Sequence, residues 1–205
     1  MKKLIIIILL FFSVQWLFGQ GEIYKIKGEY YRGNQVYCAG VKTDIFKYSA
    51  ASQENDNWCW AACVQMVLHY QGVYVSQRDL VRKAFGTTEN RPANGAAIVR
   101  AANGWRVDGK TIVAGMGNKS TINLIDDLAF HYPVIIGLDM PGQNVGHAFV
   151  LTAIFYYYDD NNTMRPYKVV LRDPWGYNDN PSRHELGWSD FYNRINTIVH
   201  VYPQN

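Results

Sequence analysis

The sequence predicts an α+β fold, in which helices come first along the chain and antiparallel strands follow. Apolar residues recur at helical spacing in several segments before Pro133. After Pro133 the segments are short, apolar and rich in β-branched and aromatic residues, which is typical of strands. This order favours a helix-rich half packed against a strand-rich half, with a cleft between them.

The first nineteen residues have the pattern of a secretion signal. Lys2 and Lys3 precede an unbroken apolar run, Leu4–Phe12, and Gly19 offers a small residue for cleavage. The run is shorter than the roughly 18–20 residues that a transmembrane helix needs. We therefore expect a secreted or periplasmic protein with no stable membrane insertion after the signal is removed. An uncleaved N-terminal anchor is the alternative.

Beyond the signal, residues 1–19, the chain divides into an N-terminal extension, residues 20–52, and a globular domain, residues 53–205. Within the extension, short β-like runs occupy Glu22–Ile26 and Val36–Tyr48. The sequence gives no prediction of the oligomeric state.

Four helices are predicted from apolar spacing combined with capping residues. The first begins near Asn57 or Trp58, with Asp56 or Asn57 as its cap, and runs to about Tyr70, where Gln71-Gly72 stops it. The second has Ser76 as its cap and Gly86 as its stop. The predicted helices span about residues 57–70, then Ser76–Phe85, Gly95–Ala102 and Ser120–His131.

The strands are predicted from runs of β-branched and aromatic residues. A turn cluster at Asp159–Asn162 makes a hairpin of the second and third strands. The predicted strands are Val134–Leu138, His147–Tyr158, Tyr167–Leu171 and Ile195–Tyr202.

Charge and ligand spacing exclude several classes of function. The formal net charge of +3 falls by two, to +1, when Lys2 and Lys3 leave with the signal. A nearly neutral chain gives no electrostatic case for binding nucleic acid or an anionic membrane.

Cys59 and Cys63 share one helix face with only His69 nearby, which is too few ligands for zinc. We expect no metal and no cofactor.

Three cysteines are an odd number for a chain sent to an oxidising compartment. Cys59 is the natural unpaired one, which leaves Cys38 and Cys63 as a possible disulfide. The sequence leaves this pairing open, because Cys63 also fits a helix interior as a small buried hydrophobe.

Cys59 stands where the first predicted helix begins, and this position suits a nucleophilic thiol. The unsatisfied N–H groups of a helix start and a nearby imidazolium both favour the thiolate. His147 opens a predicted strand, so its ring can project into the cleft and act as base, then as acid. Asp173 follows the strand expected to pair with the His147 strand. Hairpin pairing would therefore bring Asp173 beside His147, where it can orient the ring.

Acyl transfer also needs hydrogen-bond donors for a tetrahedral oxyanion. The backbone N–H of Cys59 is one donor. The side-chain amide of Gln53, six residues earlier, would be the second. Asn55, Asp56 and Asn57 supply the turn chemistry that brings the Gln53 loop back over the helix start.

These residues form a pattern that resembles the papain-like cysteine peptidases. The chain carries Gln-x5-Cys-Trp-Ala at residues 53–61, His-Ala at 147–148 and Asp-Pro-Trp-Gly at 173–176, in the order found in that family. The resemblance implies a papain-like fold, with the nucleophile helix in an N-terminal helical half and an antiparallel sheet in a C-terminal half. It also implies a protein or peptide substrate.

Position by position, the resemblance implies Cys59 as nucleophile, His147 as its base, Asp173 as the orienting residue and Gln53 as an oxyanion donor. Asp173 replaces the asparagine of papain, and Asp-Pro resembles the short bacterial members, the bacteriocin-processing and effector-type peptidases. Residues 20–52 are too few for the large inhibitory prosegment of papain-type zymogens, so we do not expect that form of control.

The motifs therefore predict a secreted cysteine peptidase. One alternative is a transglutaminase or deamidase, which uses Cys, His and Asp in the same order for another acyl transfer. A papain-fold binding protein without activity is a second alternative, and the intact Cys59, His147 and Asp173 argue against it. The sequence does not indicate substrate specificity.

Overall fold

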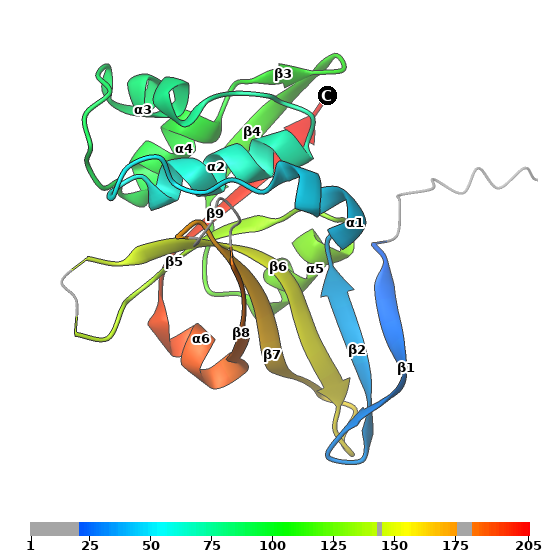
Figure 1. The fold of residues 1–205 in the computed structure, drawn as a ribbon. Helices are drawn as coiled ribbons and strands as arrows, with labels where there is room; N and C mark the ends of the chain where they lie inside the picture. The colour runs from blue at the N-terminus through cyan, green and yellow to red at the C-terminus, as the bar shows by residue number, and fades with distance from the viewer. Residues whose placement is uncertain (1–20, 143–144, 176–181) are drawn as a thin grey trace, which may run out of the picture.

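The computed structural model describes residues 21–142, 145–175 and 182–205, and the predicted signal lies outside this part of the chain. Helices dominate the first half of these residues and strands the second. The two kinds of element pack against each other around one continuous core (Figure 1). The predicted α+β fold is confirmed.

Six α-helices lie in the described residues, and four of them match the predicted helices to within two residues at each end. The other two are too short to leave a periodic signal in the sequence. None of these helices combines the length and hydropathy that a membrane crossing requires. The helices are α1 (Thr43–Phe46), α2 (Cys59–Tyr70), α3 (Gln77–Phe85), α4 (Gly95–Ala102), α5 (Thr121–Ala129) and α6 (Trp188–Arg194).

Side-chain caps fix the starts of α3 and α5, whereas α2 begins without one. The Ser76 hydroxyl accepts a hydrogen bond from the backbone N–H of Asp79, and α3 ends at Gly86 in the left-handed region with φ +78°. The residue before α2 is Trp58, which makes no side-chain cap. The predicted cap at Asp56 or Asn57 is therefore wrong. Asn57 instead bonds to Asn90 on a neighbouring loop.

The described strands form one sheet in which every pairing is antiparallel. The strand order is β1-β2-β6-β5-β9-β4-β3, and β7 and β8 continue from β6 as a branch. The strands are β1 (Ile23–Tyr31), β2 (Asn34–Gly40), β3 (Arg106–Val107), β4 (Lys110–Met116), β5 (Val134–Leu138), β6 (His147–Tyr158), β7 (Met164–Asp173), β8 (Ser182–Gly187) and β9 (Ile195–Gln204).

The four strands predicted after Pro133 are present, and β3, β4 and β8 are additional. The strand predicted over Val36–Tyr48 is wrong beyond Gly40, because α1 and a 3-10 turn at Lys47–Ser49 follow. The physical reason is Phe46, which is 1% exposed and packs against Tyr70 at the end of α2.

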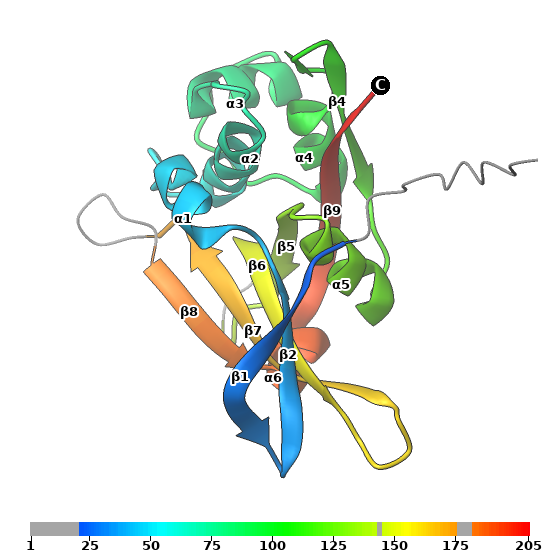
Figure 2. The same cartoon turned by 90° about the vertical axis from the view of Figure 1, so that its right-hand side faces the viewer.

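The predicted N-terminal extension contributes to the sheet that carries the rest of the fold. β2 pairs with β6 from Tyr37 to Gly40, and β1 pairs with the outer side of β2. α5 packs against β2, β5 and β6, and α6 packs against β7 and β8 (Figure 2). The division of the chain at residue 52 stays a prediction.

Helix α2 is enclosed by its neighbours. Eight of its twelve residues are buried, from Trp60 to Leu68 with Gln65 as the exception. Its neighbours are α3 and α4 on one side and β5 and β6 on the other. A helix that is apolar on nearly all sides needs such enclosure. The position of its first residue, Cys59, is therefore fixed by the packing of the rest of α2.

The three cysteines are free in the structure, so the possible Cys38–Cys63 disulfide is not formed. Cys38 is buried, and burial raises the pKa of its thiol to about 11. Cys63 is fully enclosed in α2, and burial raises the pKa of that thiol well above its usual range. Cys59 is partly exposed.

Thiol alkylation is expected to distinguish these cysteines. Near neutral pH, iodoacetamide should modify the folded protein once, at Cys59, because the other thiols are buried and protonated. Unfolding without a reductant should release three reactive thiols, counted by mass spectrometry. A count of one in the unfolded, unreduced protein would mean that Cys38 and Cys63 pair in solution.

Candidate active site

Cys59 and His147 line the same cleft, one from the helical side and one from the sheet. The cleft has a volume of about 680 Å³, and α2, β5 and β6 all contribute to its walls. Trp60, Met140 and Trp175 give it an apolar character. The expected cleft between the two halves is thus present, with the two expected residues facing it.

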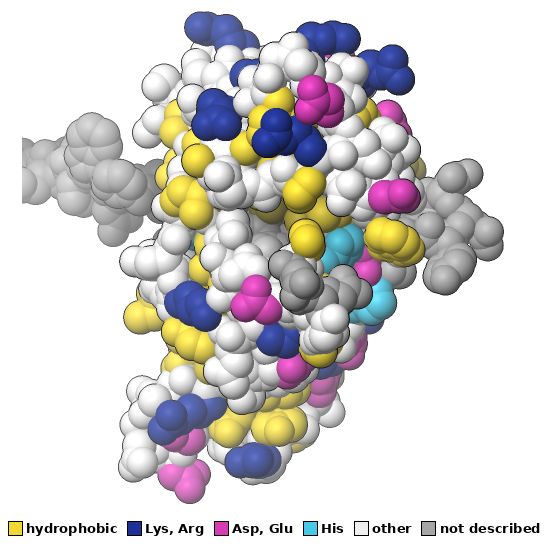
Figure 3. All heavy atoms as spheres, turned by 90° about the vertical axis from the view of Figure 1, so that its left-hand side faces the viewer, with side chains coloured by type: hydrophobic (Ala, Val, Ile, Leu, Met, Phe, Trp, Pro, Cys, Tyr) yellow, Lys and Arg dark blue, Asp and Glu magenta, His cyan; other side chains and the backbone are white. Residues whose placement is uncertain are grey.

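Charged side chains of both signs are interspersed on the face drawn in Figure 3, and histidine atoms lie beside hydrophobic ones midway along it. This distribution agrees with the nearly neutral charge of the sequence. Within the described ranges, no group of three or more His, Cys, Asp or Glu side chains is arranged to hold a metal ion.

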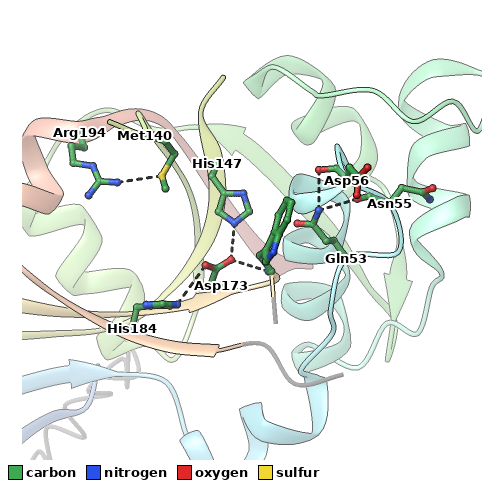
Figure 4. A network of polar contacts seen from close by, with 9 residues as sticks. Gln53, Asn55, Asp56, Met140, His147, Asp173, His184 and Arg194 are labelled. Atoms are coloured by element: carbon green, nitrogen blue, oxygen red, sulfur yellow. Dashed lines mark hydrogen bonds and ion pairs between the residues drawn. The ribbon is translucent and has the colours of Figure 1, made fainter. Parts of the chain in front are cut away.

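His147 is the first residue of β6, where the strand opens into the cleft. Its Nε2 lies 2.6 Å from Oδ1 of Asp173 (Figure 4). The ring of Phe149 meets the imidazole edge-to-face, with the centroids 4.7 Å apart. The His147 side chain is 15% exposed. A hydrogen bond on one side and an aromatic ring on the other fix the plane of the imidazole.

Asp173 is the last residue of β7 and reaches His147 through the register of the sheet. β7 runs antiparallel to β6, with Arg172 opposite Val150, so the end of one strand meets the start of the other. Oδ1 of Asp173 also accepts a hydrogen bond from the N–H of Trp175 at 2.8 Å. Its Oδ2 lies 3.5 Å from Nε2 of His184. The carboxylate is therefore held from both sides.

The pKa of His147 is raised to about 9. Burial of the ring acts in the opposite direction and favours the neutral form. Hydrogen bonds to Asp173 and to Cys59, together with their charges, outweigh the burial. The site therefore favours an imidazolium next to the thiol of Cys59.

Two indole groups anchor the start of α2, where Cys59 lies. Nε1 of Trp58 donates to the carbonyl of Glu89 at 3.0 Å, and Nε1 of Trp60 donates to the carbonyl of Arg91 at 3.2 Å. Both indoles are almost fully buried. Cys59 is the first residue of α2, so its side chain stands at the positive end of the helix, where no side-chain cap occupies the N–H groups.

Gln53 does not line the cleft that Cys59, His147 and Asp173 share. Its Nε2 donates to the carbonyls of Asn55 and Asp56, at 3.0 and 2.9 Å (Figure 4). Gln53 lines a smaller hollow of about 180 Å³ next to Pro174 and Trp175 rather than the Cys59–His147 cleft. The structure brings Cys59, His147 and Asp173 together and leaves the Gln53 amide turned toward its own loop. Its role as oxyanion donor stays a prediction.

Sequence reasoning missed the contacts that hold Asp139 and Met140, which follow β5. Nε of Arg194 donates to the carbonyl of Asp139, and the N–H of Asp139 donates to the carbonyl of Arg194. Nη2 of Arg194 also lies 3.2 Å from Sδ of Met140, a cleft residue. No local spacing could have indicated these contacts, because they join residues more than fifty positions apart.

Comparisons with known proteins agree with this arrangement. A profile of the Peptidase C39-like family matches residues 45–202. Among solved structures, the chain is similar to the peptidase domain of Streptococcus ComA, a bi-functional ABC transporter involved in a quorum-sensing pathway. The TM-score is 0.52 at 20% identity, over 77% of this chain and 99% of that domain. No curated protein sequence matches significantly.

The structural similarity supports the fold, and the family profile covers both walls of the cleft, from before Cys59 to Tyr202 in β9. The predicted resemblance to short bacterial papain-like enzymes is confirmed. The chain belongs to the Peptidase C39-like family of papain-like cysteine peptidases.

Proposed function

We propose that this chain is a secreted peptidase that hydrolyses peptide bonds with Cys59 as nucleophile, His147 as acid–base and Asp173 as the orienting group. The observation that carries the proposal is the placement of His147. Its ring lies between the Asp173 carboxylate and the thiol at the uncapped start of α2. An imidazolium held in this way stabilises a neighbouring thiolate.

The reaction follows from these positions. The Cys59 thiolate attacks the scissile carbonyl carbon, and a C–S bond forms as the carbonyl π electrons move to oxygen. When the tetrahedral species collapses, the C–N bond breaks and the His147 imidazolium gives its proton to the leaving amine. A water molecule, deprotonated by His147, then attacks the thioester. The acid product leaves, and Cys59 returns to the thiolate beside the imidazolium.

The tetrahedral oxygen needs two donors, for which we propose the backbone N–H of Cys59 and the amide of Gln53. The Gln53 amide now donates to the carbonyls of Asn55 and Asp56. Its role therefore requires one N–H to turn toward the cleft when substrate binds. Catalytic hydrogen bonds that are long or misdirected in a free enzyme often form only in the substrate complex.

The nucleophile is tested by substitution of the two cysteines of α2. Cys59→Ala should lose essentially all hydrolysis of a peptide library, because no other thiol reaches the cleft. Cys63→Ala should keep activity, since Cys63 lies one turn into the helix and is fully buried. Cleavage products are followed by mass spectrometry. Activity that survives in Cys59→Ala and is lost in Cys63→Ala would contradict the proposal.

The role of Asp173 is tested by the pH dependence of kcat/KM. Because the pair needs protonated His147, activity should fall as the pH rises through about 9. The charge of Asp173 and its hydrogen bond raise the pKa of His147 in the wild type. Asp173→Asn removes the charge and weakens the hydrogen bond, so the pKa of His147 should drop and the fall in activity should move to lower pH. Asp173→Ala should lose more activity than Asp173→Asn. Equal profiles for the wild type and Asp173→Ala would show that another group orients His147.

Export is tested by the N-terminus of the mature protein. We propose secretion or periplasmic location from the basic start and apolar run of residues 1–19. Mass spectrometry of protein from the culture medium or periplasm should find Gln20 or a neighbour as the first residue. A soluble cytosolic product that retains Met1 would argue against export.

A further inference from the structure

Gln77, the first residue of α3, makes side-chain contacts on both sides of Gln53. Its Nε2 donates to the carbonyl of Ser52 at 2.7 Å, and its Oε1 accepts from the N–H of Glu54 at 3.0 Å. The two contacts are made to the residues immediately before and after Gln53. The backbone of Gln53 is thus held between two hydrogen bonds from one side chain.

The two backbone partners fix which way the Gln77 amide points. A carbonyl needs a donor and an N–H needs an acceptor, so the nitrogen must face Ser52 and the oxygen must face Glu54. A reversed amide would lose both hydrogen bonds. The Gln77 amide therefore makes both contacts with this loop in one orientation only.

The same side chain ties the loop to the helix that begins with Cys59. Nε2 of Gln77 also donates to Oε1 of Gln65 in α2 at 3.0 Å, and Nε2 of Gln65 donates to the carbonyl of Val75. Both donors and one acceptor site of Gln77 are in use. A chain of two amides therefore connects the interior of α2 to the backbone around Gln53.

Burial shows that this arrangement is specific. Gln77 is 1% exposed, and the polar side chains that are buried to this degree in the described part of the chain are few. A buried amide is costly unless its polar atoms are satisfied. On the far side, the N–H of Gln53 donates to the carbonyl of Pro174, next to Asp173. The loop is thus held from α2 and α3 on one side and from the end of β7 on the other.

We propose that Gln77 is a positioning residue for peptide hydrolysis, which sets the place of Gln53 relative to Cys59. The inference rests on the proposed function, in which Gln53 donates to the tetrahedral oxygen. Gln77 touches neither substrate nor Cys59 and acts only through the loop. Its loss should therefore affect the transition state, where the oxyanion forms, more than substrate binding.

The test compares Gln77→Met with Gln71→Met. Both changes replace a glutamine by an apolar side chain of similar size, and Gln71, at the other end of α2, donates to the carbonyl of Val201. Gln77→Met should lower kcat by about 10–10²-fold, because small misplacements of a catalytic group have effects of this size. KM should stay within about twofold, and the rate at which iodoacetamide alkylates Cys59 should be unchanged. Gln71→Met should keep the wild-type kcat.

A double substitution separates positioning from general destabilisation. Gln53→Ala should lower kcat by about 10²–10³-fold, the usual effect of removing one oxyanion donor. If Gln77 acts through Gln53, Gln53→Ala with Gln77→Met should have the same kcat as Gln53→Ala alone. Additive losses, or a parallel loss of Cys59 alkylation, would overturn the inference.

The remaining outcomes are also decisive. If Gln53→Ala lowers kcat and Gln77→Met does not, the positioning role is wrong and the proposed function stands. If Gln53→Ala keeps the wild-type kcat while Cys59→Ala is inactive, the oxyanion role and the positioning role both fail. Should Gln77→Met not fold, Gln77→Asn replaces it, since its amide is one methylene too short to make both contacts with Ser52 and Glu54. It should lower kcat less than Gln53→Ala with unchanged alkylation, and a wild-type kcat would overturn the inference.

Discussion

The burial of α2 is the constraint on which the active site depends. Almost all residues of α2 from Trp60 to Leu68 are buried. The helix therefore fits one place in the fold, between α3 and α4 on one side and the sheet on the other. Displacement of such a helix would open cavities at each buried side chain, at about 2–5 kcal/mol for each large one. Cys59 is the residue at which α2 reaches the cleft, so the packing of the apolar core sets the position of the proposed nucleophile.

The position of the opposite wall of the cleft, which carries His147, is set by the hydrogen-bond register of the sheet. His147 opens β6 and Asp173 closes β7, and antiparallel pairing brings these two ends together. A shift of one residue would turn the side chains to the other face of the sheet. Val150 and Leu151 are adjacent residues of β6 that point to opposite faces, and both are fully buried, so a shift would disrupt packing on both faces of the sheet. The His147–Asp173 contact is thus protected by residues that take no part in it.

The residues with a local or periodic signature were predictable from the sequence. Helices α3 and α4 have clear caps, β5 and β6 have clear apolar runs, and the short motifs singled out Cys59, His147 and Asp173, which the structure brings together. Prediction failed where a contact between distant segments decided the conformation. Phe46 turns inward onto Tyr70 and replaces a predicted strand with α1. Arg194 holds the loop at Asp139 and Met140, far away in sequence, and no spacing rule indicates such a pair.

The Gln53 loop lies between these two cases, because its motif is local and its position is not. Gln53 is recognisable six residues before Cys59, yet its backbone is held by Gln77 from the helical side and by the Pro174 carbonyl from the sheet side. A relative shift of the two walls would therefore strain this loop, whereas the His147–Asp173 contact lies within one wall and would be unaffected. The proposed oxyanion donor therefore depends on the relative position of the two halves, as does the pair formed by Cys59 on the helical side and His147 on the sheet side.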